Sequence, residues 1–306
     1  MDAILTLDQV VKTYDKHTAV DHVSFEVPRG SIFGLLGPNG AGKTSLIRII
    51  TTITRADQGK VLLDGELLNN RHPAQIGYMP EERGLYKKMK VGDHLMYLAR
   101  LKGLSKKDAK SKIDYWFEKF EITDWWGKKV EELSKGMQQK IQFITTVVHE
   151  PKLLILDEPF SGLDPINTNL IKDEIDQLHK QGTSIIFSTH RMEQVEEICE
   201  HIVLINQGKN ILGGQVKAVK DQFKLHNYQI TYEGTLPTNL GAQVKIIEQK
   251  QNQLTVHLTP GTDSGSLLQF LINNGVRIIS FNEILPSLNE IFIQQVEGAN
   301  AAALIQ

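Results

Sequence analysis

Eight consecutive residues near the N-terminus carry the strongest chemical signal in the sequence. Residues 37–44 read GPNGAGKT, which matches the pattern G-x-x-x-x-G-K-[ST] of phosphate-binding loops. The glycines let backbone N–H groups approach anionic oxygens closely, because no side chain stands in the way. Lys43 adds a positive charge that can reach the β- and γ-phosphates, and Thr44 adds a hydroxyl that can bind Mg²⁺. The motif therefore predicts binding of a nucleoside triphosphate.

The segments on either side of this motif have the character that a phosphate-binding loop requires. The apolar run 32–36 before it predicts a buried strand, and the helical spacing of apolar residues over 44–53 predicts a helix after it. A glycine-rich stretch can be only a turn, but the fixed spacing and the two flanking elements argue against that alternative. The residues predicted to surround the phosphates are Gly37, Pro38, Asn39, Gly40, Ala41, Gly42, Lys43, Thr44 and Ser45.

Two acidic residues, Asp157 and Glu158, follow a second apolar run at 153–156. This run predicts a buried strand, and ligands of open α/β sheets bind at the C-terminal ends of the strands. Asp157 is suited to hold Mg²⁺, and Glu158 to polarise the attacking water as a general base. Adjacent acids after a strand can also form a solvated turn, but the presence of a phosphate loop in the same chain favours the catalytic interpretation.

Strand and helix patterns alternate through the first 220 residues. A Lys- and Leu-rich segment at about 88–150 has helical spacing and predicts a helical insert, in which we interpret Trp125 and Trp126 as packing residues rather than an aromatic ligand box. Apolar runs separated by helical patterns predict a mainly parallel α/β sheet. The strands predicted in this part of the chain lie at 4–11, 20–27, 32–36, 152–156, 183–188 and 202–206, and residues 60–68 predict a small hairpin or strand turn.

The pattern changes after about residue 220, and a second domain is expected there. We predict a first domain over 1–220 and a small α+β accessory domain over 221–306. No catalytic set is recognisable in the accessory domain, and we expect it to mediate dimer contacts or regulation. Its predicted strands lie at 228–232, 243–247, 254–258 and 276–281, and its predicted helices at 264–273 and 287–296.

Composition and charge narrow the class of protein. The 306 residues are 41% hydrophobic, which is enough for a core in each of two domains. The formal net charge is −2, so nothing in the overall charge favours nucleic acid, and no nucleic-acid partner is expected. The single cysteine excludes an internal disulfide and indicates a reducing compartment. No segment approaches the roughly 18 apolar residues of a membrane span, and no signal peptide is recognisable, so a cytoplasmic protein is expected.

Further segments, taken with the motifs above, resemble the nucleotide-binding subunits of ABC transporters. Residues 133–140 read LSKGMQQK and resemble the LSGGQ signature, with departures at the third and fifth positions. Residues 161–164 read SGLD and match the D-loop, while His190 matches the switch histidine. Tyr14 lies where the family has an aromatic residue that stacks on adenine. The resemblance implies a P-loop NTPase of ABC type, in the α/β class, with a mainly parallel core sheet, an antiparallel β subdomain and a helical insert.

This resemblance also implies a mechanism. Two copies of the chain would form a head-to-tail dimer around two ATP molecules with Mg²⁺, each bound between the phosphate loop of one subunit and the signature segment of its partner. In the signature, Ser134 and the backbone N–H of Gly136 would donate hydrogen bonds to the γ-phosphate, with the N-terminus of the following helix favouring negative charge, and Gln138 would also belong to the nucleotide-binding segment. The family further implies that His190 contacts the γ-phosphate and holds the attacking water, and that Asp164 links the two sites.

One position departs from the family pattern. Glu81 aligns with a glutamine that the family usually has after an apolar strand. A carboxylate can still bind Mg²⁺ directly or through water, but it cannot donate a hydrogen bond as glutamine does. Two interpretations therefore stay open: Glu81 lies close to the magnesium ion, or Glu81 and Glu82 form a solvated turn.

Three functions are compatible with these motifs. The first is an ATPase subunit that powers a separately encoded transmembrane permease, because residues 81–86 (EERGLY) and 285–292 (LPSLNEIF) resemble the sodium- and drug-efflux branch of two-component bacterial exporters. Such a subunit would be cytoplasmic and bound to the inner face of the cell membrane through the permease. The second is a soluble mechanical ATPase of translation or DNA repair, which the single phosphate loop and short insert disfavour. The third is an ATP-binding regulatory subunit without turnover, which the intact catalytic residues disfavour.

Overall fold

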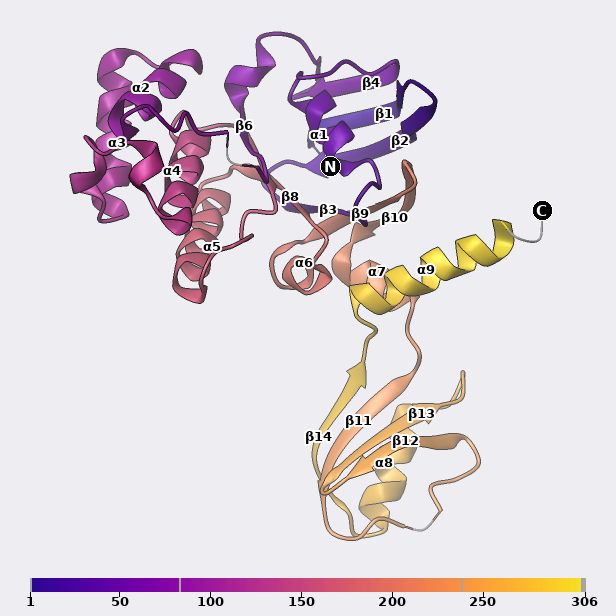
Figure 1. Ribbon diagram of the computed structural model, residues 1–306. Helices are drawn as coiled ribbons and strands as arrows, with labels where there is room; N and C mark the ends of the chain where they lie inside the picture. Colours follow the sequence, from indigo (N-terminus) through magenta and orange to yellow (C-terminus); the bar gives the residue numbers. More distant parts are fainter. Residues whose placement is uncertain (1, 83, 238, 304–306) are drawn as a thin grey trace. The chain divides into compact units, whose positions relative to one another are not determined.

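The computed structural model describes residues 2–82, 84–237 and 239–303, with side chains described as far as residue 296. The chain divides into two compact units, Met1–Val216 and Lys217–Gln306. In the described residues the first unit contains two sheets and the second contains one, and each unit has its own buried core (Figure 1). None of the helices in the described part of the chain is long and apolar enough to cross a membrane.

A six-stranded sheet forms the centre of the first unit, in the order β10-β9-β3-β8-β7-β6. All neighbouring pairs are parallel except β10 and β9. Every residue of β3, β7 and β8 is buried, which explains why these strands are continuous apolar runs in the sequence. The mainly parallel core sheet is thus confirmed. Its strands are β3 (Ile32–Leu36), β6 (Ile76–Met79), β7 (Leu153–Asp157), β8 (Ser184–Thr189), β9 (His201–Asn206) and β10 (Lys209–Gln215).

An antiparallel sheet in the order β2-β1-β4-β5 accompanies the central sheet. Helix α1 (Lys43–Ile50) buries Leu46, Ile47 and Ile50 in a core to which both sheets contribute. This core fixes the start of α1, where the phosphate loop ends, against the central sheet. The antiparallel subdomain is confirmed, and its strands are β1 (Ala3–Tyr14), β2 (His17–Pro28), β4 (Gln58–Leu63) and β5 (Glu66–Leu67).

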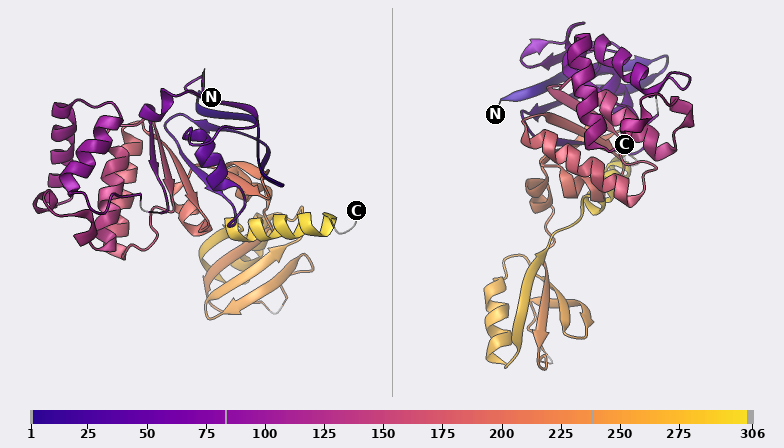
Figure 2. Two further views of the ribbon diagram at one scale, coloured as in Figure 1. Left: turned by 45° about the horizontal axis from the view of Figure 1, so that its top comes forward. Right: turned by 90° about the vertical axis from the view of Figure 1, so that its left-hand side faces the viewer.

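Helices α2, α3 and α4 form the predicted insert and lie together beside the central sheet (Figure 2). The hydroxyl of Ser105 accepts a hydrogen bond from the backbone N–H of Asp108 and caps α3. The Trp126 ring packs against Phe117, with ring centroids 5.5 Å apart, in agreement with a packing role. The bounds are α2 (Val91–Leu101), α3 (Lys106–Lys119) and α4 (Lys135–Val147), with short 3₁₀ turns at η1 (His72–Gln75), η2 (Thr123–Trp125) and η3 (Val130–Glu132).

Two helices complete the first unit, α5 (Pro165–Lys180) and α6 (Met192–Ile198). Helix α5 begins directly after the segment that matches the D-loop, and Asp164 is its N-cap. Helix α6 follows β8 and lies against β3 and β8. The segments after β7 and β8 therefore leave the same edge of the sheet as the phosphate loop after β3.

The second unit contains an antiparallel sheet in the order β12-β13-β11-β14. Helix α8 buries Leu267 and Leu271 against apolar side chains of this sheet, among them Ile230 and Val256. The predicted small α+β arrangement is confirmed here. The elements are α7 (Val216–Gln222), β11 (Asn227–Glu233), β12 (Val244–Lys250), β13 (Gln253–Leu258), α8 (Ser264–Asn273), β14 (Arg277–Ile284) and α9 (Leu288–Ala303).

Candidate active site

The phosphate loop packs tightly against neighbouring backbone. Gly42 has φ +110°, and a Cβ atom there would lie 2.2 Å from the carbonyl oxygen of Ala19. Gly37 has φ +150°, and its Cβ would lie 2.2 Å from the carbonyl oxygen of Ile205. Neither the backbone angle nor the space allows another residue at these positions. Local packing alone therefore requires glycine at these two positions of the motif.

Lys43, the first residue of α1, is buried within its own loop. Its Nζ donates to the carbonyl oxygens of Gly37, at 2.6 Å, and Pro38, at 3.0 Å. Burial lowers the pKa of Lys43, although the nearby carboxylates of Asp157 and Glu158 act in the opposite direction. The ammonium group therefore contacts the glycine loop and shares a cavity with the carboxylates of Asp157 and Glu158.

Asp157 is the last residue of β7, and its side chain is buried. Its Oδ1 accepts a hydrogen bond of 2.8 Å from the Ser188 hydroxyl, which belongs to the adjacent strand β8. Burial raises the pKa of Asp157, and the hydrogen bond from Ser188 partly offsets this effect. A buried carboxylate with one free oxygen beside a lysine suits a hard cation such as Mg²⁺.

Glu158 takes a backbone conformation that is uncommon for glutamate, with φ +49°. Its N–H donates to the carbonyl oxygen of Ser188 at 2.9 Å, which ties the turn to β8. Its carboxylate accepts three hydrogen bonds from the last residue of β8 and the residue after it: from the Thr189 hydroxyl at 3.0 Å, the His190 N–H at 2.8 Å and His190 Nδ1 at 2.6 Å. Glu158 is therefore held in a fixed position rather than free in solvent, which disfavours the solvated-turn alternative.

A cavity of about 320 Å³ brings most of the predicted residues together. It is lined by Tyr14 of β1, by the phosphate loop from Asn39 to Ser45, and by Glu81, Asp157 and Glu158. Two further lining residues, His17 and Ala19, were missed in the sequence. They lie at the start of β2, where a short turn pairs His17 with Tyr14. Recognising this turn in the sequence would have placed them near the cavity.

Tyr14 lies at the mouth of this cavity with 39% of its surface exposed. The Nζ of Lys12 lies 5.4 Å from the centre of its ring. An exposed aromatic ring beside a phosphate loop offers a flat apolar surface on which a base can stack. The geometry is therefore compatible with the adenine contact that the resemblance implied.

The signature residues do not line the cavity within one chain. The Ser134 hydroxyl caps α4 by accepting from the N–H of Met137, at 3.3 Å. The Gln138 side chain is turned inward, and its Nε2 donates to the carbonyl oxygen of Leu133 at 3.0 Å. Asp164 caps α5, and its carboxylate accepts hydrogen bonds from the backbone N–H and the side-chain amide of Asn167. Any contact of these residues with the nucleotide requires a second chain.

Gly136 lies in the first turn of α4, where packing within the chain leaves room for a side chain. A Cβ atom there would meet only the Nδ2 atom of Asn167, at 3.5 Å, which is an ordinary van der Waals distance. Gly136 thus differs from Gly42, whose neighbours exclude a side chain. Among the described residues, nothing in the packing explains a glycine at position 136.

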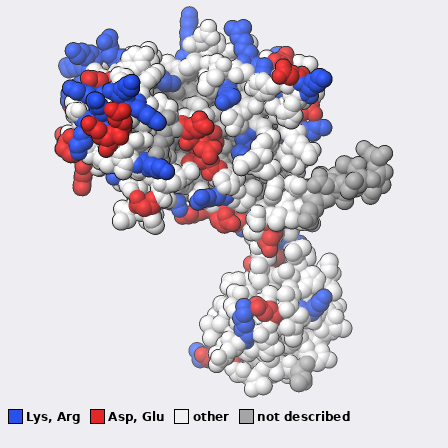
Figure 3. Space-filling model, in the orientation of Figure 1, with Lys and Arg blue, Asp and Glu red and all other residues white. Residues whose placement is uncertain are grey.

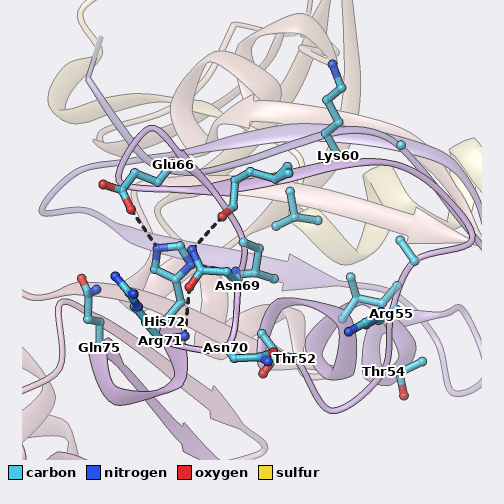
Figure 4. Close-up of a pocket in the computed structure, with 16 residues that line it drawn as sticks. Thr52, Thr54, Arg55, Lys60, Glu66, Asn69, Asn70, Arg71, His72 and Gln75 are labelled. Carbon is cyan, nitrogen blue, oxygen red and sulfur yellow. Dashed lines mark hydrogen bonds and ion pairs between the residues drawn. The ribbon is translucent and has the colours of Figure 1, made fainter.

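A larger cavity, of about 920 Å³, lies elsewhere, between the end of α1, strand β4 and η1 (Figure 4). His72 Nδ1 accepts from the N–H of Asn69 at 3.0 Å, and His72 Nε2 lies 3.6 Å from Glu66 Oε2. Asn69 in turn bonds the backbone of Leu67 and of Arg71. These contacts stabilise the loop that they belong to, and we assign no chemistry to this cavity.

Comparison with known proteins identifies the class of this chain. Residues 20–161 match the ABC transporter family, and residues 214–296 match the family described as ATP-binding protein DrrA1-3-like, C-terminal domain. The uncharacterized ABC transporter ATP-binding protein YhaQ of Bacillus subtilis (strain 168) is 45% identical over 294 residues, which is 96% of this chain and 98% of that protein. The chain belongs to the ATP-binding subunits of ABC transporters and is an ABC-type ATPase.

Two further relatives have more specific names. The linearmycin resistance ATP-binding protein LnrL of Bacillus subtilis (strain 168) is 35% identical over 214 residues, covering 69% of each chain. The lipopolysaccharide export system ATP-binding protein LptB of Haemophilus influenzae is 33% identical over 240 residues, covering 73% of this chain and all of that protein.

Solved structures confirm the fold. An ATP-binding subunit of an ABC transporter superposes with a TM-score of 0.68 at 28% identity, covering 72% of this chain and 93% of that one. The ATP-binding cassette MJ0796, solved as a dimer in a post-hydrolysis state with ADP and Pi, superposes with a TM-score of 0.64 at 20% identity, covering 69% and 98%. The family that residues 20–161 match is that of ABC transporters, whose cassettes bind ATP.

Proposed function

We propose that this chain hydrolyses ATP in a head-to-tail homodimer and thereby powers an exporter whose membrane helices belong to a separate polypeptide. The supporting observation is the position of Glu158, whose carboxylate is fixed by three hydrogen bonds at the cavity that also contains Lys43 and Thr44. A fixed carboxylate beside a phosphate loop is placed to polarise a water molecule toward the γ-phosphate.

The residues that line the cavity are assigned to parts of the substrate by their places around it, whereas His190 and Asp164, which are not among its described lining residues, are assigned by the family resemblance. The backbone N–H groups of 37–45 surround the phosphates, Lys43 contacts the β- and γ-phosphates, and Tyr14 stacks on the adenine. His190 keeps Glu158 in position and contacts the γ-phosphate. Asp164, at the start of α5, connects the two sites of the dimer.

Mg²⁺ would be held by the Thr44 hydroxyl and the Asp157 carboxylate, which line the same cavity. Both groups present oxygen atoms, the donors that this ion prefers. The bound ion would neutralise charge on the β- and γ-phosphates. Glu81 lies in the same cavity and is placed to assist as an outer ligand, through water.

The partner chain would complete each site with its signature segment. Ser134 begins α4, so the N–H groups of the first helical turn and the helix dipole favour an anion at this end. Gly136 would allow close approach of the partner's nucleotide, which accounts for a glycine that the packing of its own chain does not require. Gln138 would then act by holding the segment before α4, through its bond to Leu133.

A permease coupled to ATP hydrolysis would contact the chain close to this site, and we propose that it binds in an apolar groove of about 480 Å³. Exposed side chains along it include Ile53 and Leu101, with 63% and 64% of their surface accessible. Gln142 Nε2 of α4 donates to the carbonyl oxygen of Pro80 at 2.7 Å, directly before Glu81. A permease segment in the groove would therefore touch residues that lead both to the cavity and to α4.

We further propose that the permease is an exporter. The relative LnrL is named for linearmycin resistance, and the relative LptB is named for lipopolysaccharide export. The C-terminal unit matches a family named for a DrrA-like ATP-binding protein. We accordingly place the chain on the inner face of the membrane, bound through its permease.

ATP hydrolysis and oligomeric state, measured with and without Mg-ATP for the wild type and Glu158→Gln, test this proposal. We expect the wild type to hydrolyse ATP and the variant to lose at least ~100-fold in rate, because glutamine cannot accept a proton. We also expect the variant to accumulate as an ATP-bound dimer on size-exclusion chromatography. A variant that hydrolyses ATP as fast as the wild type would exclude Glu158 as the base.

A further inference from the structure

The helical insert carries a local excess of positive charge that the whole chain does not have. Residues 87–112 contain nine Lys or Arg and two Asp, whereas the formal net charge of the chain is −2. Figure 3 shows basic side chains gathered over the insert, at the upper left, with a smaller acidic group beside them. The charge is therefore concentrated on α2, the start of α3 and the segments around them.

Part of this charge surrounds a shallow hollow of about 760 Å³ between α2, α3 and Trp126. Helix α2 contributes one face, because its lining residues are spaced three and four apart. The hollow combines cationic, aromatic and aliphatic groups with one carboxylate. Its lining residues are Asp93, Met96, Tyr97, Arg100, Leu101, Lys106, Lys110 and Trp126.

The aromatic and cationic groups of this hollow are arranged at its surface. Tyr97 has 47% of its surface exposed, and Trp126 is half-buried over Gly92. Lys110 Nζ lies 4.4 Å from the Trp126 ring centre and also pairs with Asp114. Among the residues that the structure describes, neither Arg100 nor Lys106 has a carboxylate within ion-pair distance. Two cations thus remain available to an external anion.

We propose that this basic-aromatic surface, formed by Tyr97, Arg100, Lys106, Lys110 and Trp126, binds the headgroups of anionic phospholipids. Tyrosine and tryptophan favour the interface between water and lipid, where the ring is partly buried and its polar atom stays hydrated. Lysine and arginine beside them are attracted by the negative charge of the bilayer surface. The combination fits a membrane surface better than a dissolved anion, which would not need the exposed aromatic ring.

The position of the surface agrees with this partner. Leu101 lines both the hollow and the groove that we propose for the permease, so the two surfaces are continuous. A subunit bound to a permease through the groove would bring the hollow toward the lipid around that permease. This part of the inference rests on the proposed function, whereas lipid binding by the isolated chain does not.

Co-sedimentation of the full chain with vesicles tests the inference without a permease. One set of vesicles is phosphatidylcholine alone, and the other contains about one third phosphatidylglycerol. We expect binding to the second set only, and a steep decrease as salt is raised, because surface charges are screened over ~10 Å at 0.1 M. All three tryptophans lie within residues 116–126, so their fluorescence reports contact with the insert.

The variant Arg100→Glu/Lys106→Glu/Lys110→Glu should bind anionic vesicles at least ~10-fold more weakly than the wild type. The control Lys180→Glu/Lys217→Glu/Lys245→Glu changes the net charge equally at exposed positions outside this surface. The variant Arg100→Gln/Lys106→Gln/Lys110→Gln removes the three positive charges without adding negative ones, so it should weaken vesicle binding less than the glutamate variant does. It tests the inference if the glutamate variant fails to fold.

Equal weakening by the control, or equal binding to both sets of vesicles, would overturn the inference. Absence of vesicle binding by the wild type would overturn it as well, and would leave an acidic segment of the permease as the partner of these cations. None of these outcomes affects the ATPase activity or co-purification with a permease, which are measured separately. Failure of lipid binding is therefore distinguishable from failure of the proposed function.

Discussion

The Glu158 carboxylate and the imidazole of His190 form a direct contact, with Oε1 and Nδ1 2.6 Å apart. The same oxygen also accepts the backbone N–H of His190 at 2.8 Å. The contact arises because β7, which precedes Glu158, pairs with β8, which precedes His190. The strand order of the sheet thus places the proposed base and the proposed switch residue side by side.

Replacing His190 by alanine removes the side-chain part of this contact but leaves the backbone hydrogen bond to Glu158. We expect kcat for ATP hydrolysis to fall by roughly 10- to 100-fold, since the carboxylate loses one of three restraints and a γ-phosphate contact. ATP affinity should change little, because the phosphate loop remains intact. Steady-state kinetics with nucleotide-binding measurements check this, and His257→Ala, in the second unit, should leave both unchanged.

Thr189 acts on the reaction through Glu158, as a positioning residue. Its buried hydroxyl donates to Glu158 Oε2 at 3.0 Å and accepts from the N–H of Arg191 at 3.1 Å. Thr189→Val keeps the shape and removes both bonds, so we expect kcat to fall by about 10-fold with KM unchanged. Thr189→Ser should restore most of the activity. A purely structural role would instead lower the stability of both variants without this separation of kcat from KM.

Gly42 and Gly40 make a matched pair for testing the phosphate loop. Gly42→Ala places a methyl group 2.2 Å from the Ala19 carbonyl oxygen, whereas Gly40→Ala meets no atom of the described residues within 4 Å. Both residues have positive φ, so both variants carry backbone strain of roughly 1–3 kcal/mol. Only Gly42→Ala must also shift the loop, and it should abolish ATP binding in a calorimetric titration. Equal affinities of the two variants would contradict this argument.

Gly136→Ala tests whether glycine at this position is required for folding of the single chain or for formation of the dimer. Alanine fits the space at this position and favours helix by up to ~1 kcal/mol, so the unfolding free energy should stay the same or rise. The ATP-dependent dimer of Glu158→Gln, by contrast, should be lost in the double variant, because the added methyl would face the partner's nucleotide. Analytical ultracentrifugation of both proteins with ATP measures the fraction of dimer. An unchanged fraction of dimer would show that Gly136 lies outside the interface.

The sequence was most informative where burial imposes a simple pattern. The runs at β3, β7 and β8 are fully buried on both faces, so each is continuously apolar and could be recognised without other information. β10 and α7 were not predicted. Most residues of β10 are exposed and two of them are glycines, because the strand lies at an edge of the sheet.

The phosphate loop was predicted residue by residue, because its chemistry is local in sequence. The contact between Glu158 and His190 could not be predicted in this way, because it depends on which strands are neighbours in the sheet. Neither segment by itself contains information on the order of the strands. His17 enters the cavity through the register of the β1–β2 hairpin, which places it opposite Tyr14. The inward turn of Gln138 depends on the loop before α4, which has no recognisable sequence pattern.

His94 makes the stability of the helical insert sensitive to acid. Its ring is fully buried in α2 beside Tyr86, and neither ring nitrogen has a hydrogen-bond partner among the residues described. Burial lowers the pKa of His94 to about 4, below its ordinary value of 6.5. Because the unfolded chain binds the proton more readily than the folded one, stability is highest above pH 6.5 and decreases as the pH falls from there toward 4.

The size of this effect follows from the two pKa values. Between pH 7 and pH 5, the His94 contribution should lower the unfolding free energy by about 2 kcal/mol. His94→Leu removes the titrating group and should make the pH dependence shallower by this amount in urea unfolding followed by tryptophan fluorescence. His149, whose pKa is also lowered to about 4 by burial, serves as an internal comparison, because its contribution persists in the variant. An unchanged slope in His94→Leu would show that His94 becomes protonated within the folded protein, which requires water or a partner to reach the ring.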